Sequence, residues 1–492
     1  MLFEPLFAHA KDQPDSVAVI DDNGRFSYGR VAAMAAGLGM YISLQTQKPR
    51  VGLLLPPGVG FVASFYGTLL AGKTAVPINY LLGDKEIAHI IQDSDIDIVL
   101  TVPFFVPRLK DFPLKVIDLM QLPKDPPKIE PQFPHPMPED VAVLLYTSGS
   151  TGMPKGVLLT YQNLQSDVDA SIEYADLQHK HVFLGIIPLF HTFGLTAMLL
   201  APIQLGSTVI YVARFSPVAT LKALREHKAS IIFGTPSMIA AIARLKDAKP
   251  DDFAHIYAII AGGEALPEAL REGFKQRFGI PLYEGYGLTE TSPVVAINAP
   301  GRNRPGSVGG LIPGAVARIV NDNGNPLPTG QIGEIWLKGP MIMKGYHNLP
   351  NETAEVLMPD GYFKTGDLGR VDTEGFLYIT GRKKEMIIVA GEKAYPREIE
   401  DTLLRHPAVH EAAVVGKKDP GRGEAVVAFV IPKEGQTVQP DQLRSFARDQ
   451  GLAQWKVPKE IFVVEDLPRS PTGKVLKREL AQKVNASGAP TT

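Results

Sequence analysis

A run of hydroxyl and glycine residues, Tyr146-Thr-Ser-Gly-Ser-Thr-Gly-Met-Pro-Lys155-Gly156, follows the apolar stretch 141–145. It places four hydroxyl side chains (Thr147, Ser148, Ser150, Thr151) and two glycines (Gly149, Gly152) within six residues. Glycines let the backbone approach a polyphosphate closely, and hydroxyl and backbone N–H groups donate to its oxygens. Lys155 adds a positive charge for the same anion. The run therefore predicts a phosphate-binding loop. It is not a Walker loop, because no Lys-Ser or Lys-Thr pair follows the glycines.

Seven later segments combine glycine with charged, hydroxyl or aromatic residues. In chain order they are 188–194, 261–265, 283–291, 333–340, 362–367, 381–387 and 471–474. Together with the hydroxyl-rich loop they resemble, in the same order, the motifs of the adenylate-forming superfamily of acyl-CoA synthetases, luciferases and peptide-synthetase adenylation domains. They are most similar to those of fatty-acid–CoA ligases. The resemblance implies an AMP-forming acid–thiol ligase that uses ATP, Mg²⁺ and CoA with a small-molecule carboxylic acid.

The resemblance implies roles for individual residues in activating the acid. Negative charge builds at the α-phosphate of ATP when the carboxylate attacks it, so cations and hydrogen-bond donors placed there are the main catalytic resource. Lys474 would contact the carboxylate and the α-phosphate, and Thr289 the α-phosphate. Glu290, with Thr151, would hold Mg²⁺, a cation that prefers oxygen ligands. His191 would lie beside the acyl pocket.

The other candidates are assigned by the same resemblance to the nucleotide and to CoA. Tyr286 would stack on adenine, while Asp367 would accept hydrogen bonds from both ribose hydroxyls beside Arg382. Lys384 would be the hinge of the C-terminal domain, and Gly391 would admit the pantetheine arm of CoA. The full binding set is Thr147, Ser148, Gly149, Ser150, Thr151, Gly152, Lys155, Gly263, Glu264, Ala265, Glu284, Gly285, Tyr286, Gly287, Thr289, Asp367, Arg382, Lys384, Gly391 and Lys474.

Taken singly, several of these residues also fit ordinary structural positions. Tyr286 is of a type that more often fills a core, Glu290 of a type that caps helices, and Lys474 of a type common on surfaces. His191 equally fits a polar residue in the pocket wall. The segment 389–396 departs from the family's commoner Gly-Gly-Glu-Asn-Ile version, which affects the neighbours of Gly391.

Strand-like and helix-like runs alternate over most of the chain. Strands are expected at 51–55, 74–78, 96–101, 141–146, 182–187, 208–212, 230–233 and 256–261, and helices at 217–226 and 267–278. This alternation predicts an α/β fold with largely parallel sheets. Gly-rich turns from about residue 306 predict a smaller barrel-like part. We expect a large N-terminal domain, 1–383, and a small mobile α+β C-terminal domain, 384–492.

Composition narrows the classes of function. The 492 residues include no cysteine, which excludes disulfides, a thiolate nucleophile and zinc–thiolate sites. Basic and acidic residues nearly balance, 50 against 52, which argues against nucleic-acid binding. Prolines, glycines and polar residues interrupt the uncharged stretch 181–213, which predicts a buried strand–helix–strand unit rather than a membrane span. The N-terminus lacks a signal-peptide pattern, so a cytoplasmic location is expected. Peripheral membrane contact and oligomerisation stay open.

The expected walls of the acyl pocket, 187–194, 232–238, 261–264 and 286–294, contain no lysine or arginine. Such walls suit an alkyl tail better than a second carboxylate, because a buried charge needs a partner. We therefore expect a medium- or long-chain fatty acid. The alternatives are a dicarboxylate resembling malonate or methylmalonate, held by Arg302 or Arg304, an aryl acid, and transfer to a carrier protein. A non-catalytic nucleotide binder and a luciferase-like oxygenase are further alternatives, and the intact Lys474, Glu290 and Asp367 argue against the first.

Overall fold

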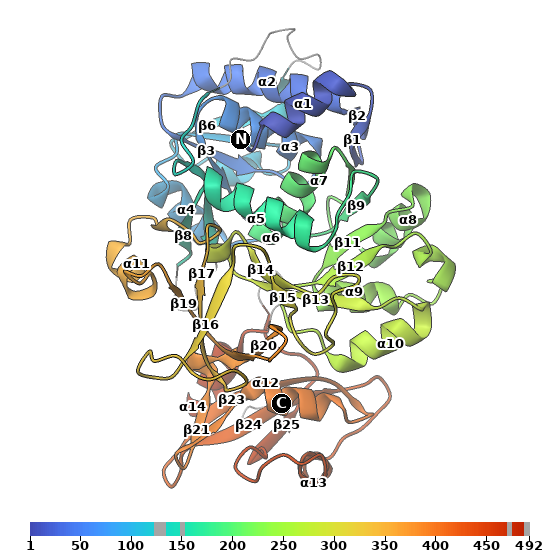
Figure 1. The fold of residues 1–492 in the computed structure, drawn as a ribbon, viewed down its shortest axis with the longest axis vertical. Coiled ribbons are helices and arrows are strands. Elements are labelled where there is room, and N and C mark those ends of the chain that lie inside the picture. The colour runs from blue at the N-terminus through green and yellow to red at the C-terminus, as the bar shows by residue number, and fades with distance from the viewer. Residues whose placement is uncertain (123–133, 148–152, 470–474, 487–492) are drawn as a thin grey trace. The chain divides into compact units, whose positions relative to one another are not determined.

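A computed structural model describes residues 1–122, 134–147, 153–469 and 475–486. The chain forms two compact units, each drawn in Figure 1. Unit 1 comprises Met1–Ala265, Phe274–Val316 and Leu337–Phe363, and unit 2 comprises Leu266–Gly273, Ala317–Trp336 and Lys364–Thr492. The domain limits expected from the sequence, 1–383 and 384–492, stay a prediction.

Unit 1 contains a nine-stranded sheet in the order β15-β14-β13-β12-β11-β9-β10-β1-β2. The six strands from β13 to β1 run parallel, and β2, β14 and β15 are each joined to the preceding strand of the sheet by an antiparallel pair. Their bounds are β1 Val17–Asp21, β2 Gly24–Ser27, β9 Val182–Gly185, β10 Thr208–Tyr211, β11 Ile231–Gly234, β12 Ala258–Ala261, β13 Leu282–Gly287, β14 Val294–Ile297 and β15 Gly310–Leu311.

A second, seven-stranded sheet of unit 1 has the order β18-β8-β7-β4-β3-β5-β6. Its strands from β7 to β6 are parallel, β8 pairs antiparallel with β7, and β18 pairs antiparallel with β8. The bounds are β3 Arg50–Leu54, β4 Thr74–Pro77, β5 Ile98–Thr101, β6 Lys115–Asp118, β7 Val141–Thr147, β8 Lys155–Thr160 and β18 Gly345–Tyr346. The predicted α/β class with largely parallel sheets is confirmed, with antiparallel strands added at the edges.

Helices pack against these sheets (Figure 1). They are α1 Glu4–Asp12, α2 Tyr28–Gln45, α3 Val59–Leu70, α4 Asp84–Asp93, α5 Tyr161–Tyr174, α6 Thr192–Leu195, α7 Ala201–Leu205, α8 Pro217–His227, α9 Pro236–Ala243 and α11 Pro350–Val356, with α10 Glu268–Phe278 spanning the boundary of the units. The apolar face of α4, which includes Ile87 and Ile90, is buried in a core with Leu54, Val99 and Leu144. That core fixes the position of α4 on the second sheet.

The uncharged stretch 181–213 forms β9, a helical segment and β10, as predicted. The helical segment is α6 and α7 joined by a π-helical stretch, Thr196–Leu200, and nearly all of it is buried. Within the described part of the chain, no helix combines the length and apolarity needed to span a membrane.

Unit 2 contains a four-stranded sheet, β16-β17-β19-β20, and a five-stranded sheet, β22-β21-β24-β23 with β25 beside β24. The bounds are β16 Val316–Val320, β17 Gly333–Lys338, β19 Phe363–Val371, β20 Leu377–Arg382, β21 Ile387–Val389, β22 Glu392–Ala394, β23 Val409–Asp419, β24 Gly423–Pro432 and β25 Glu460–Val463. Helices α12 Pro396–Leu404, α13 Pro440–Asp449 and α14 Lys477–Ala486 complete the α+β module. Leu403 and Leu443 pack with Val414 in its core.

Candidate active site

The hydroxyl-rich loop is the connection of a β-hairpin. Strands β7 and β8 pair antiparallel, and Thr147 faces Lys155 across the ladder at the open end of the loop. The residues between them that the sequence singled out, Ser148, Gly149, Ser150, Thr151 and Gly152, lie outside the described residues. A strand follows this loop where a helix follows a Walker loop, in agreement with the distinction drawn from the sequence.

Helix α4 holds both ends of this loop. The Tyr146 hydroxyl, just before the loop, donates to Asp93 Oδ2 at 2.6 Å. His89 Nε2 donates to the carbonyl oxygen of Pro154, just after it, at 3.0 Å. Burial, and then the hydrogen bond to Asp93, raise the pKa of Tyr146, so its phenol stays a neutral donor. The described residues at both ends of the loop are therefore attached to one helix.

Thr289 and Glu290 lie in a short 3-10 turn, η5 Thr289–Thr291, that follows β13. The turn is closed by Thr291, whose Oγ1 accepts from the Leu288 amide at 2.9 Å. Thr192 Oγ1, at the start of α6, lies 3.4 Å from Thr289 Oγ1. The predicted acyl-pocket segment and the predicted α-phosphate residue are thus adjacent in unit 1.

Tyr346 on β18 joins this turn to the hydroxyl-rich loop. Its hydroxyl donates to Glu290 Oε1 at 2.8 Å, and the Lys155 Nζ lies 5.5 Å from the centroid of its ring. Burial first, and the charge of Glu290 second, raise the pKa of Tyr346, which keeps the phenol protonated. Tyr346 therefore contacts two candidate residues that come from different motifs.

The predicted adenine segments lie at the ends of neighbouring parallel strands. Gly263, Glu264 and Ala265 follow β12, while Glu284, Gly285, Tyr286 and Gly287 end β13, and Ala261 is the ladder partner of Glu284. Ligands of open α/β sheets bind beyond the carboxyl ends of such strands. The ring of Phe193 packs closely against Gly262, because a Cβ on Gly262 would lie 3.0 Å from that ring. The structure brings both segments to one edge of the first sheet.

His191 precedes α6 among aromatic side chains. Its ring centroid is 5.2 Å from that of Phe190, which lies 4.9 Å from Tyr80, which in turn stacks on Phe105 at 5.2 Å. Burial lowers the pKa of His191 to about 4 and raises the pKa of Tyr80 to about 12, so both are neutral at neutral pH. His191 therefore lies beside an aromatic cluster, and neither its own ring nor Tyr80 carries a charge at neutral pH.

Unit 2 carries the predicted ribose and CoA residues. Asp367 and Arg382 are ladder partners on β19 and β20, and Arg382 Nε lies 2.9 Å from Asp367 Oδ1, whose side chain is only 4% exposed. Lys384 is exposed in the 3-10 turn η6 Lys383–Glu385. Gly391 has a φ of +88° in the two-residue turn between β21 and β22, with open space where a Cβ would stand. The two ribose candidates thus lie beside each other.

Lys474 lies outside the described residues, but the helix after it is well anchored. Lys477 Nζ, on the first turn of α14, lies 2.7 Å from Glu400 Oε1 on α12. Glu400 Oε1 also accepts from the Val414 amide at 2.7 Å. Lys477 is therefore an ion-pair partner of a largely buried carboxylate.

Three residues of this arrangement are absent from the sequence prediction: Tyr346, Asp93 and His89. Asp93 also accepts from His347 Nε2 through its carbonyl oxygen at 3.0 Å, so α4 contacts the segment next to Tyr346 as well. None of these residues stands in a motif-like spacing. The pairing of β18 with β8 reveals Tyr346, and the packing of α4 reveals Asp93 and His89, since both bring residues distant in the chain together.

The described residues fit magnesium only as a partner of substrate phosphates. They contain no group of three or more His, Cys, Asp or Glu side chains that could hold a metal ion. Mg²⁺ commonly uses one or two carboxylates together with phosphate oxygens and water. Glu290, with one oxygen fixed by Tyr346, matches that requirement, whereas a cage built from protein groups alone does not.

The chain matches two known family models that together cover most of its length. The family model for the AMP-binding enzyme matches residues 6–347, and that for the AMP-binding enzyme C-terminal domain matches residues 398–474. The chain therefore belongs to the AMP-binding enzyme family. It is an AMP-forming acid–thiol ligase, whose substrates are a carboxylic acid, ATP and CoA.

Relatives within the family act on different acids. The chain is 34% identical to a long-chain-fatty-acid–CoA ligase of Bacillus subtilis, covering 96% of this chain and 92% of the relative. It is 37% identical to a sulfoacetate–CoA ligase of Cupriavidus necator, covering 91% and 88%. The solved structure of ATP-bound MatB from Rhodopseudomonas palustris superimposes with a TM-score of 0.92 at 28% identity, covering 99% of each chain. The likeness extends over the whole chain and does not single out one acid.

Proposed function

We propose that this enzyme is a fatty-acid–CoA ligase that prefers medium- to long-chain acids. The observation that carries the proposal is the neutral aromatic cluster beside His191, in which Phe190 contacts His191 and Tyr80 packs on Phe190. An alkyl tail gains from burial against such side chains, whereas a second carboxylate would need a cation. The relative from Bacillus subtilis supports the same choice.

A dicarboxylate substrate would need Arg302 or Arg304 to hold its second carboxylate. The guanidinium of Arg302 lies 5.1 Å from the ring centroid of Tyr174, on the last turn of α5, and its side chain is exposed. That contact fits a residue of a solvated loop better than a residue aimed at a buried carboxylate. A dicarboxylate is for this reason the less favoured substrate.

In the proposed reaction the carboxylate attacks the α-phosphorus of ATP, pyrophosphate leaves, and the thiol of CoA then takes the acyl group and releases AMP. Lys155 and the hydroxyl-rich loop would bind the outer phosphates, and Thr289 would donate to the α-phosphate. Mg²⁺ bound through Glu290 would supply positive charge to the phosphate oxygens. Asp367 and Arg382 would bind ribose, and Lys474 would reach the α-phosphate.

An aryl acid is the second candidate, because the same aromatic side chains would stack on a ring. The relatives include a feruloyl-CoA synthase of Amycolatopsis at 33% identity over 96% of the chain, which supports it. The two candidates differ in the shape of the acid, flexible chain against planar ring, and one assay separates them.

The test is a CoA-thioester assay over saturated acids from butanoate to stearate, with benzoate, ferulate, malonate and methylmalonate alongside. Hydroxylamine replaces CoA in a parallel series, so that activation is measured without thioester formation. We expect kcat/KM to rise with chain length and to be low for the diacids. A preference for ferulate would favour the aryl alternative, and turnover of malonate or methylmalonate alone would contradict the proposal. Activation without any CoA thioester would indicate a carrier protein as the acceptor.

A further inference from the structure

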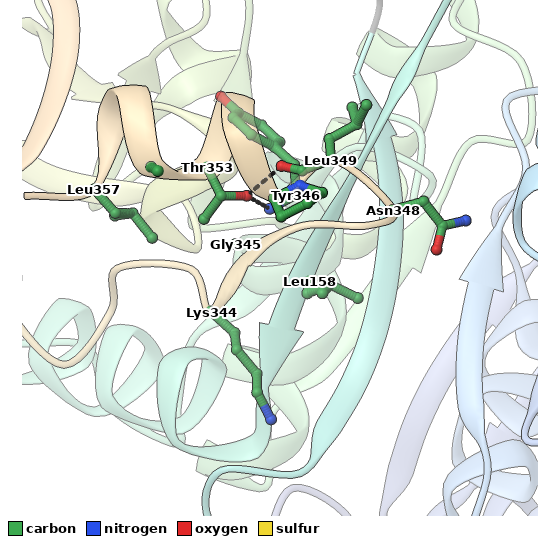
Figure 2. Close-up of a pocket in the computed structure, with 10 residues that line it drawn as sticks. Leu158, Lys344, Gly345, Tyr346, Asn348, Leu349, Thr353 and Leu357 are labelled. Atoms are coloured by element: carbon green, nitrogen blue, oxygen red, sulfur yellow. Dashed lines mark hydrogen bonds between the residues drawn. The ribbon is translucent and has the colours of Figure 1, made fainter.

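The backbone around Tyr346 is fixed on two sides. Its amide donates to Thr353 Oγ1 at 2.9 Å, and Thr353 donates in turn to the Leu349 carbonyl at 2.8 Å, the two bonds drawn in Figure 2. On the other side the His347 amide donates to the Gly156 carbonyl at 2.8 Å, next to Lys155. A pocket of 410 Å³ borders this turn. The strand β18 is therefore attached to α11 and to the end of the hydroxyl-rich loop.

The same segment is bonded to the turn that carries Glu290. The Met343 amide donates to the Glu290 carbonyl at 2.9 Å, and Ser292 Oγ donates to the Met341 carbonyl at 2.9 Å. The Glu290 backbone is thus held in register with β18, while the Tyr346 hydroxyl holds its carboxylate through Oε1. A carboxylate fixed through one oxygen presents the other in a defined direction, which a metal ligand requires.

The ring of Tyr346 makes the second contact. Lys155 Nζ lies 5.5 Å from its centroid, within the range of a cation–π interaction. The ring restricts the long lysine side chain without neutralising its charge, so the charge stays available for an anion. One side chain thereby contacts both the cation and the carboxylate that the proposed function assigns to ATP.

We propose that Tyr346 is a positioning residue that orients Glu290 for Mg²⁺ through its hydroxyl and Lys155 for phosphate through its ring. The proposal rests on the proposed function in two respects, the assignment of Glu290 to the metal and that of Lys155 to phosphate. Tyr346 lies outside the motifs on which the sequence prediction depends. Its hydroxyl would orient Glu290 and its ring would orient Lys155.

The test measures binding rather than turnover. Mg²⁺ is titrated calorimetrically into the full-length enzyme saturated with α,β-methylene-ATP, which cannot be cleaved at the α-phosphate. Hydrogen bonds to charged groups are strong enough that Tyr346→Phe should weaken Mg²⁺ affinity about tenfold. Affinity for AMP, which needs no metal, should be unchanged, and this also reports that the variant is folded. Tyr346→Leu should in addition weaken the binding of the analogue without metal, because Lys155 loses the ring.

Tyr378→Phe is the matched control. The Tyr378 hydroxyl donates to Asp372 Oδ2 at 3.2 Å, and the Arg370 guanidinium lies 4.0 Å from its ring centroid. The chain thus contains a second tyrosine with one carboxylate and one cation contact, on β20, away from Glu290 in sequence and sheet. Its loss should leave Mg²⁺ affinity unchanged. If Tyr346→Phe gives the same result as Tyr378→Phe, the positioning role is wrong.

Glu290→Gln separates the inference from the function on which it rests. If this variant loses Mg²⁺ affinity while Tyr346→Phe does not, Glu290 is the metal residue and the role of Tyr346 is overturned. If Glu290→Gln keeps the affinity of the unmodified enzyme, the metal assignment itself is overturned, and the role of Tyr346 with it. Loss of affinity in both variants supports both.

Discussion

At the scale of single residues, the chemistry of Lys155, Glu290 and Asp367 depends on partners that come from elsewhere in the chain. Lys155 lies over a tyrosine ring, Glu290 accepts from the same tyrosine, and Asp367 pairs with Arg382. Each contact fixes a side chain that would otherwise sample many rotamers. In their proposed roles these residues would be held ready for the substrate, which would reduce the ordering that binding must impose.

Lys474 is the residue with the largest predicted effect on chemistry. Lys474→Ala should lower the rate of acyl-adenylate formation by about 100-fold, because loss of one donor to a developing negative charge has effects of that size. The measurement is pyrophosphate release with hydroxylamine and the preferred acid. Lys433→Ala, at an exposed lysine of the same unit, is the control and should keep the full rate. Unchanged pyrophosphate release from Lys474→Ala would remove the assignment.

At the scale of elements, two turns and one helix position the candidate groups. The turn after β13 holds Thr289 and Glu290, the hairpin β7–β8 holds Thr147 and Lys155, and α14 begins three residues after Lys474. The turn after β13 is fixed by tight backbone packing, and α14 is fixed by a largely buried ion pair. Changes at these fixing points should affect the chemistry by displacing the candidate groups that they hold.

Gly287 permits the turn that carries Glu290. A Cβ at this position would lie 1.8 Å from the Pro293 carbonyl oxygen, so Gly287→Ala must displace backbone. We expect loss of adenylation by about 100-fold or more, since a displacement of this kind moves Thr289 and Glu290 together. Gly273→Ala on α10 is the control, because a Cβ there meets nothing within 4 Å. That helix should gain stability of about 0.5–1 kcal/mol with unchanged kinetics. Normal adenylation by Gly287→Ala would contradict the account.

The ion pair Lys477–Glu400 anchors α14 to α12. Burial raises the pKa of Glu400, and the charge of Lys477 opposes that rise. Removing the lysine by Lys477→Met leaves a largely buried carboxylate without its cation, which should cost about 3 kcal/mol of stability at neutral pH. Urea unfolding followed by tryptophan fluorescence is selective here, since both tryptophans, Trp336 and Trp455, belong to unit 2.

The pH dependence of that loss has a defined sign. The folded-state pKa of Glu400 lies above its unfolded value, so the folded unit binds the proton more tightly and loses stability as pH rises from the unfolded pKa to the folded one. Lys477→Met should extend this loss to higher pH. The variant should be close to the unmodified enzyme near pH 4 and furthest below it near pH 7. An equal loss at both pH values would contradict a charge-based anchor.

At the scale of the whole molecule, the candidate residues are divided between two compact units. Unit 1 carries Lys155, His191, Thr289 and Glu290, and unit 2 carries Asp367, Arg382, Lys384 and Gly391. Under the proposed roles, both half-reactions would need residues of both units, and the expected hinge at Lys384 would serve such a division.

Lys384→Pro tests that hinge. Proline fixes φ near −65° and removes an amide hydrogen, so it should restrict a backbone rotation that lysine permits. We expect thioester formation to fall about tenfold or more while hydroxamate formation is nearly unchanged. Lys384→Ala keeps the backbone freedom and should retain both steps. Equal loss of the two steps in Lys384→Pro would argue against the hinge.

The fold class, the family and the reaction class of this protein could be predicted from its sequence alone. The alternation of strand and helix predicted the α/β class, because parallel sheets covered by helices impose that pattern on any chain. The order of eight motifs predicted the family and the reaction, and the strands expected at 74–78, 141–146 and 208–212 agree with β4, β7 and β10 to within one residue at each end. The motifs could be recognised from the sequence because each is formed by residues that are close together in the chain.

Only the tertiary structure decided which distant residues complete the candidate site. Tyr346, Asp93 and His89 follow from the pairing of β18 with β8 and from the packing of α4, and neither is encoded in hydrophobic period or motif spacing. The two-residue strand β18 is too short for a sequence pattern, yet it joins Lys155 to Glu290 through one tyrosine. Which residues meet depends on strand order in the sheet, and strand order is a property of the folded chain.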